Sequence, residues 1–107
     1  MAKYLKRIGP TQIITSAATI FTVTAGEQWI VKHFRLTNAT NSVNGASISV
    51  GTLGSTTQIR NAAQTIPIEG SEDSYMQLAF NSGEIMQALA TVSGMLITID
   101  IDRYVVG

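Results

Sequence analysis

The residue best suited to chemistry in this sequence is His33, the only histidine among 107 residues. Histidine changes its charge near neutral pH and commonly serves as a general base or a metal ligand. A serine nucleophile would need His33 as its base, yet no Gly-x-Ser-x-Gly turn occurs in the chain. Cysteine is absent from the sequence, which removes disulfides, thiolate metal sites and a cysteine nucleophile. We therefore expect a protein that is not an enzyme, with His33 on a strand at a surface or interface.

Acidic residues gather at two places where they could meet calcium. Glu69, Glu72 and Asp73 crowd one segment, while Asp100 and Asp102 are two residues apart and so share one face of a strand. Calcium takes six or more oxygen ligands, and neither spacing follows a known calcium loop. We expect solvated acidic faces and no cofactor, with calcium at these turns as the open alternative.

The composition is that of a strand-rich chain with few charges. Isoleucine (13), threonine (13) and valine (7) are branched at Cβ, which suits a pleated strand better than a helix. Charged residues make up 13% of the chain, and no apolar run approaches the roughly 18 residues of a membrane span. Residues 1–60 carry six basic residues and one acidic residue, and residues 61–107 carry the reverse. Because no basic face forms, we expect neither nucleic acid nor a membrane as partner.

Alternating apolar and polar residues predict short strands separated by turns rich in glycine, asparagine and serine. The strand at 28–37 has a mixed pattern, which indicates that it bends or changes neighbours midway. Asn44-Gly45 predicts a hairpin turn, 70–73 an acidic turn, and 54–64 either a helical turn or a loose edge. Strands are expected at 12–16, 19–24, 28–37, 46–53, 65–69, 74–80, 84–90 and 95–106. We therefore predict an all-β fold, an antiparallel β-sandwich of jelly-roll type with about eight short strands.

The first eleven residues differ from the rest of the chain. Gly9-Pro10 interrupts the sequence before the first alternating stretch, so we expect residues 1–11 to form an N-terminal arm and residues 12–107 a single domain. The following segment is too polar for the apolar core of a signal peptide, which predicts a protein made and kept in the cytoplasm or in an assembly formed there.

Residues 20–38 carry a recognisable pattern, a strand, an alanine-glycine turn, a long strand and then Leu-Thr-Asn (IFTVTAGEQWIVKHFRLTN). With TIPI at 65–68, Leu78, SGEI at 82–85 and a closing isoleucine-rich strand, the chain resembles the small β-sandwich virion proteins of tailed bacteriophages over residues 18–103. It departs from their pattern at Thr24, where a proline is frequent. The resemblance implies a virion structural protein, made in the host cytoplasm, and most specifically a capsid decoration (cement) protein.

The resemblance also implies partners and contact residues. The major capsid protein is the expected partner, and the protein is expected to form a homotrimer on the capsid surface. Its N-terminal arm is expected to reach the shell through Lys3, Tyr4, Lys6 and Arg7, with simple terminal disorder of residues 1–11 as the open alternative. The expected interface residues of the long strand are Trp29, His33 and Arg35. Two alternatives stay open: a phage tail or head-fibre adaptor, and a small carbohydrate-binding module that uses Trp29 and nearby tyrosines.

Overall fold

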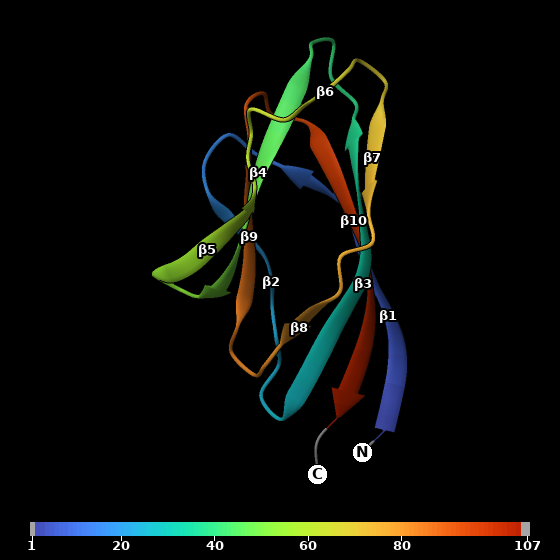
Figure 1. The fold of residues 1–107 in the computed structure, drawn as a ribbon, viewed down its shortest axis with the longest axis vertical. Coiled ribbons are helices and arrows are strands. Elements are labelled where there is room, and N and C mark those ends of the chain that lie inside the picture. The colour runs from blue at the N-terminus through green and yellow to red at the C-terminus, as the bar shows by residue number, and fades with distance from the viewer. Residues whose placement is uncertain (1, 106–107) are drawn as a thin grey trace.

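Strands account for all of the regular structure in the computed structural model, which describes residues 2–105 (Figure 1). The described residues contain no helix that could cross a membrane. Their ten strands are β1 (Ala2–Ile13), β2 (Ala18–Thr22), β3 (Glu27–Asn38), β4 (Asn44–Thr52), β5 (Ser55–Arg60), β6 (Thr65–Ile66), β7 (Ser71–Ser74), β8 (Leu78–Phe80), β9 (Ile85–Ala90) and β10 (Met95–Val105).

The strands form two antiparallel sheets that face each other (Figure 1). The first sheet has the order β1-β10-β3-β7, with β8 also paired to β3, and the second has the order β2-β9-β4-β5, with β6 paired to β4. The prediction of an all-β antiparallel sandwich is thus confirmed, with ten strands in the described residues rather than about eight.

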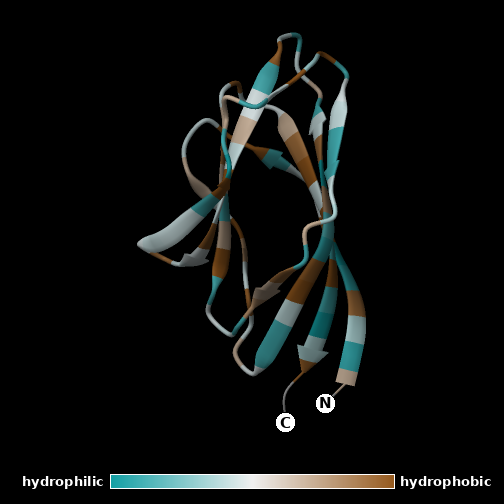
Figure 2. Ribbon diagram, viewed as in Figure 1, coloured by the Kyte–Doolittle hydropathy of each residue, from teal (hydrophilic) through white to brown (hydrophobic). Residues whose placement is uncertain are grey.

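The core lies between the two sheets and is built by alternation along the strands. Ile97, Ile99 and Ile101 of β10 point inward and are 0–1% exposed, as their clean alternation predicted. They meet the inward residues of the opposite sheet, among them Ile48 and Met86, which are fully buried. Figure 2 shows the same alternation as hydrophobic and hydrophilic bands along the strands. Burial of these apolar side chains is the main favourable contribution to folding.

A β-bulge in β3 explains the mixed pattern of that strand. Val31 pairs with Ile101, and His33 pairs with Asp100, the residue next to Ile101 in β10. Lys32, between Val31 and His33, is therefore an extra residue that has no partner of its own in β10. Val31 and Phe34 are both buried, which turns Lys32 and His33 toward the outer face together. The neighbour of β3 also changes here, from β8 on one side of the bulge to β7 on the other. The prediction that this strand changes neighbours midway is confirmed.

The segment expected to be an N-terminal arm is an edge strand. Residues 2–13 pair with β10 along nearly its whole length, whereas Met1 lies outside the described residues. Gly9-Pro10 does not end the β pattern: the two residues form a bulge between the pairs Ile8–Ile99 and Thr11–Ile97. An edge strand tolerates proline because one of its sides needs no ladder hydrogen bonds. The boundary placed between an arm and a domain is therefore wrong for residues 2–11.

Two expected turns are also strands. Asn44 and Gly45 begin β4, where the Asn44 side chain donates to Val92 O (2.7 Å) and accepts from Val92 N (2.9 Å). The acidic segment forms β7, which pairs with residues 34–37 of β3 although it has no apolar alternation to reveal it. Within 54–64, residues 55–60 form β5, which pairs with β4 at the edge of the second sheet, so the edge alternative describes them and the helical turn does not. Of the strand expected at 74–80, Ser74 instead ends β7, and only residues 78–80 form a strand of their own, β8.

Candidate functional site

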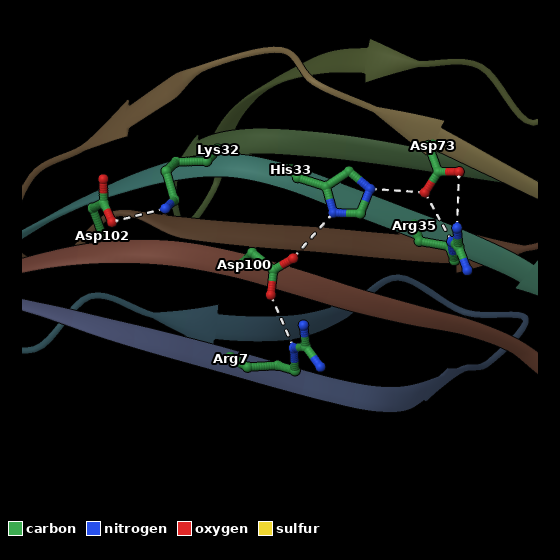
Figure 3. Close-up of polar contacts among 7 residues, drawn as sticks. All are labelled: Arg7, Lys32, His33, Arg35, Asp73, Asp100 and Asp102. Atoms are coloured by element: carbon green, nitrogen blue, oxygen red, sulfur yellow. Dashed lines mark hydrogen bonds and ion pairs between the residues drawn. The ribbon is translucent and has the colours of Figure 1, made fainter.

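Four neighbouring strands of the first sheet place a row of charged side chains on its outer face (Figure 3). Arg7 comes from β1, Asp100 from β10, His33 and Arg35 from β3, and Asp73 from β7. We call these five residues the His33 cluster. The β3 bulge makes the cluster possible, because it turns His33 outward between its two carboxylate neighbours.

The distances show a continuous chain of polar contacts. His33 Nε2 lies 2.7 Å from Asp73 Oδ1, and His33 Nδ1 lies 3.1 Å from Asp100 Oδ2. Arg35 donates to both oxygens of Asp73, with distances of 2.8 and 3.1 Å. Arg7 donates from Nε to Asp100 Oδ1 at 2.9 Å. Positive and negative groups therefore alternate across the sheet from one edge strand to the other.

These contacts shift the acid–base equilibria of the cluster. Hydrogen bonds from Arg35 and then His33 lower the pKa of Asp73 to about 2. The hydrogen bond from Arg7 is the main cause of the lowered pKa of Asp100. The pKa of His33 is raised, first by its contact with Asp73, although partial burial opposes this shift. All three shifts favour the charged forms, so the cluster is most strongly bound when His33 is an imidazolium.

A second group of charges continues the pattern along the same face. Asp102 lies 3.1 Å from Lys32 Nζ and 3.6 Å from Lys3 Nζ (Figure 3 draws the first pair). Every carboxylate considered for calcium on this face is thus engaged by a cation of the chain itself. Within residues 2–105, no group of three histidine, aspartate or glutamate side chains is arranged to hold a metal ion.

An open groove of about 630 Å³ adjoins the His33 cluster. Tyr75 forms one wall, 74% exposed and stacked on the His33 ring with centroids 4.7 Å apart and an angle of 29° between the planes. Leu5 of β1, which is 78% exposed, lies on the groove as well. The groove therefore offers exposed apolar surface beside paired charges, which suits contact with another protein surface.

The residues expected to contact a capsid all lie on β1, in different settings. Lys3 and Arg7 belong to the charged outer face. Tyr4 is about half exposed with the Arg103 guanidinium 5.0 Å from its ring, and the Lys6 ammonium lies 5.3 Å from the Trp29 ring. The first sheet therefore holds these four residues in fixed positions.

Of the three expected interface residues, His33 and Arg35 lie on the outer face and Trp29 does not. Trp29 is 4% exposed, packs against Phe21 with centroids 5.2 Å apart, and donates from Nε1 to Glu27 Oε1 at 2.8 Å. Burial of this large aromatic ring in the core stabilises the fold more than its exposure on the surface would. Trp29 is consequently wrong as a contact residue of the folded chain, and it cannot serve as an exposed platform for a sugar.

Sequence reasoning missed the two partners of His33. Asp100 could have been found, because it alternates outward on β10, the strand that pairs with β3. Asp73 could not, since β7 carries no strand pattern and its pairing with β3 spans about forty residues of chain.

Comparison with known proteins identifies a likeness of fold only. No protein-family model matches the sequence, and no curated protein is similar to it. A chain from the disulfide-linked pili that form Bacillus endospore appendages has a similar structure, with a TM-score of 0.53. The two chains share 13% sequence identity, over 99% of this chain and 87% of the pilus chain.

Proposed function

We propose that the protein is a structural subunit that binds to an assembled protein shell, as a capsid decoration protein of a tailed bacteriophage. The observation that carries this proposal is β1, a twelve-residue strand at the end of the first sheet. The edge of β1 that faces away from β10 has no strand partner among the described residues. An edge strand of this length is a template for pairing with another chain.

The side chains of β1 favour a protein surface as the partner. Leu5 exposes 78% of its surface, and Lys3 and Arg7 flank it at alternate positions of the strand. An apolar residue between two basic ones suits a partner surface that combines an apolar contact with acidic side chains. The sequence resemblance to virion proteins names that partner as the major capsid protein. A subunit that binds only the assembled shell stabilises it by mass action.

Trimer formation is part of the same proposal and draws on the two edges of the first sheet. Basic residues lie on β1 at one edge, and Glu72 and Asp73 lie on β7 at the other. Contacts between unlike edges of neighbouring copies join subunits head to tail. Such contacts form a closed ring when the rotation from one copy to the next is a whole fraction of a full turn, which is one third for a trimer.

A filament or fibre subunit is the second candidate, which includes a phage tail or head-fibre adaptor. Head-to-tail contacts that do not close produce filaments. The likeness to a pilus chain favours this candidate, since that protein uses a similar fold in pili. The disulfide links named for those pili would have no counterpart here, because this chain has no cysteine.

Counting the copies of this chain in purified virions by quantitative mass spectrometry tests the proposal. A decoration protein is expected in hundreds of copies, near one for each capsid subunit. A handful of copies would instead place the chain in a tail, fibre or vertex, and its absence from particles would overturn both virion assignments.

Binding to empty capsids tests the role of β1 directly. A double variant, Lys3→Glu with Arg7→Glu, is expected to lose capsid binding while keeping the strand signature of the circular dichroism spectrum. The matched control is Lys32→Glu, which changes a basic residue on the inner strand β3 of the same face. Equal loss of binding in both proteins would contradict a specific role for the β1 edge.

A further inference from the structure

His33 is held by acceptors on both sides of its ring. Its two nitrogens lie 2.7 Å from an Asp73 oxygen and 3.1 Å from an Asp100 oxygen. An ionised carboxylate can only accept hydrogen bonds, and a neutral imidazole carries a single N–H. Both contacts are therefore hydrogen bonds only when the ring carries two protons.

We propose that His33 is a proton-operated clasp across the outer face of the first sheet. In its doubly protonated form it joins Asp73 on β7 to Asp100 on β10 (Figure 3). After losing one proton it can hold only one of them, and the other carboxylate then faces a lone pair of the ring. The bulge at Lys32 is the structural feature that aims the ring at both acceptors.

The groups around His33 favour its doubly protonated form. Asp73 approaches from β7, Asp100 from β10, and the Tyr75 ring stacks on one face of the imidazole. Arg35 and Lys32, on β3 itself, are bound to Asp73 and Asp102 respectively. Both carboxylates favour the imidazolium, and the pKa of His33 is raised accordingly.

The two halves of the clasp are not equivalent. The contact to Asp73 is the shorter one and the larger cause of the raised pKa of His33, so Nε2 is the nitrogen that keeps its proton. Nδ1 then loses its proton and the Asp100 contact is released. Asp100 also binds Arg7 of β1, so deprotonation breaks the chain of side-chain contacts that runs from Arg7 through Asp100 to His33 on β3. The clasp is a property of the isolated protein and does not depend on binding to a shell.

An NMR titration of the imidazole ring tests the clasp without any variant, because the chain has one histidine. The expected result is an apparent pKa above 6.5, with two protonated ring nitrogens below it and the Nε2–H tautomer above it. A pKa at or below 6.5, or a ring that is neutral at pH 5.5, would overturn the proposal.

Carboxylate variants separate the clasp from the general effect of charge. Asp100→Asn and Asp73→Asn are each expected to shift the His33 pKa downward. Asp102→Asn removes the same charge from the same strand face but has no contact with the ring, so the His33 pKa should stay unchanged. An equal shift in all three variants would show that net charge, and not the two contacts, sets the pKa.

The folding equilibrium gives a second measurement. Each unit by which folding raises the His33 pKa corresponds to about a tenfold larger folding constant at low pH than at high pH. Urea unfolding at pH 5.5 and 8.5 should show this decline in the wild type and a smaller one in His33→Gln. The same decline in both proteins would contradict the clasp, and the NMR titration decides the case if the variant does not fold.

Discussion

Arg60 and Glu72 connect the two sheets of the sandwich through a bidentate pair. Arg60 Nε lies 2.7 Å from Glu72 Oε2 and Nη2 lies 3.1 Å from Oε1, so β5 of the second sheet is tied to β7 of the first. The same guanidinium donates to the carbonyl oxygens of Ala46 (2.6 Å) and Gln64 (2.8 Å). Hydrogen bonds from Arg60 lower the pKa of Glu72.

Arg60→Ala should therefore be strongly destabilising, by about 3 kcal/mol, because it leaves buried carbonyls and a carboxylate without their donor. Urea unfolding measures this loss. Arg35→Ala is the matched control, since Arg35 also makes a bidentate pair but on an exposed face, where water and salt screen the pair and it contributes little to stability. Similar losses in the two variants would show that burial of Arg60 does not matter.

Acid should destabilise the fold through the carboxylates of the His33 cluster. A carboxylate whose pKa is lower in the folded protein than in the unfolded chain stabilises the fold at any pH above the unfolded-chain pKa. That contribution is lost as the pH falls through the pKa of the folded protein. For Asp73 this window extends from about pH 4 down to about 2, and the pKa of Asp100 is lowered in the same direction. Unfolding experiments between pH 5 and 2 should show a smaller decline for Asp73→Asn than for the wild type. An equally steep decline in that variant would assign the acid sensitivity to other groups.

Asn38 should be indispensable although it lies in no charged site. It is fully buried at the end of β3, and its amide group donates to the carbonyl oxygens of Ser42 (2.8 Å) and Ile66 (2.9 Å), which ties two loops together. Asn38→Asp replaces this donor by an acceptor facing buried oxygens, so we expect a loss of about 2 kcal/mol or more in the free energy of unfolding. The exposed Asn41 in the same loop is the control, because Asn41→Asp should change that free energy by less than about 0.5 kcal/mol.

The core strands could be predicted from the sequence because alternation is a local signal. Met95, Ile97, Ile99 and Ile101 recur at every second position and are all buried in β10. The mixed pattern at 28–37 also pointed to a real feature, the bulge at Lys32. Period-two patterns report which face is buried, and they do so without knowledge of the neighbouring strand.

The edge strands and the site could not be predicted in the same way. β1 contains Gly9-Pro10 and many charges, and β7 has no apolar alternation, so neither shows the pattern of a buried face. The cluster around His33 depends on the register of β3 against β10 and β7. Its two carboxylate partners, Asp100 and Asp73, lie 67 and 40 positions from His33 in the sequence. Such long-range register is decided by packing and not by local propensity.

The β1 edge should be needed for binding and dispensable for folding, and two exposed leucines allow a direct comparison. Leu5 on β1 is 78% exposed, and Leu53 between β4 and β5 is 76% exposed, on a hairpin that points away from β1 (Figure 1). Leu5→Ser and Leu53→Ser should each change the free energy of unfolding by less than about 0.5 kcal/mol, since neither side chain is packed. If Leu5 becomes buried against a shell, its replacement removes about 1.5 kcal/mol or more of binding, or about tenfold in affinity. Sedimentation with empty capsids should show this loss for Leu5→Ser alone. If Leu53→Ser weakens binding instead, the contact surface lies on the β4–β5 hairpin and the assignment of β1 is wrong.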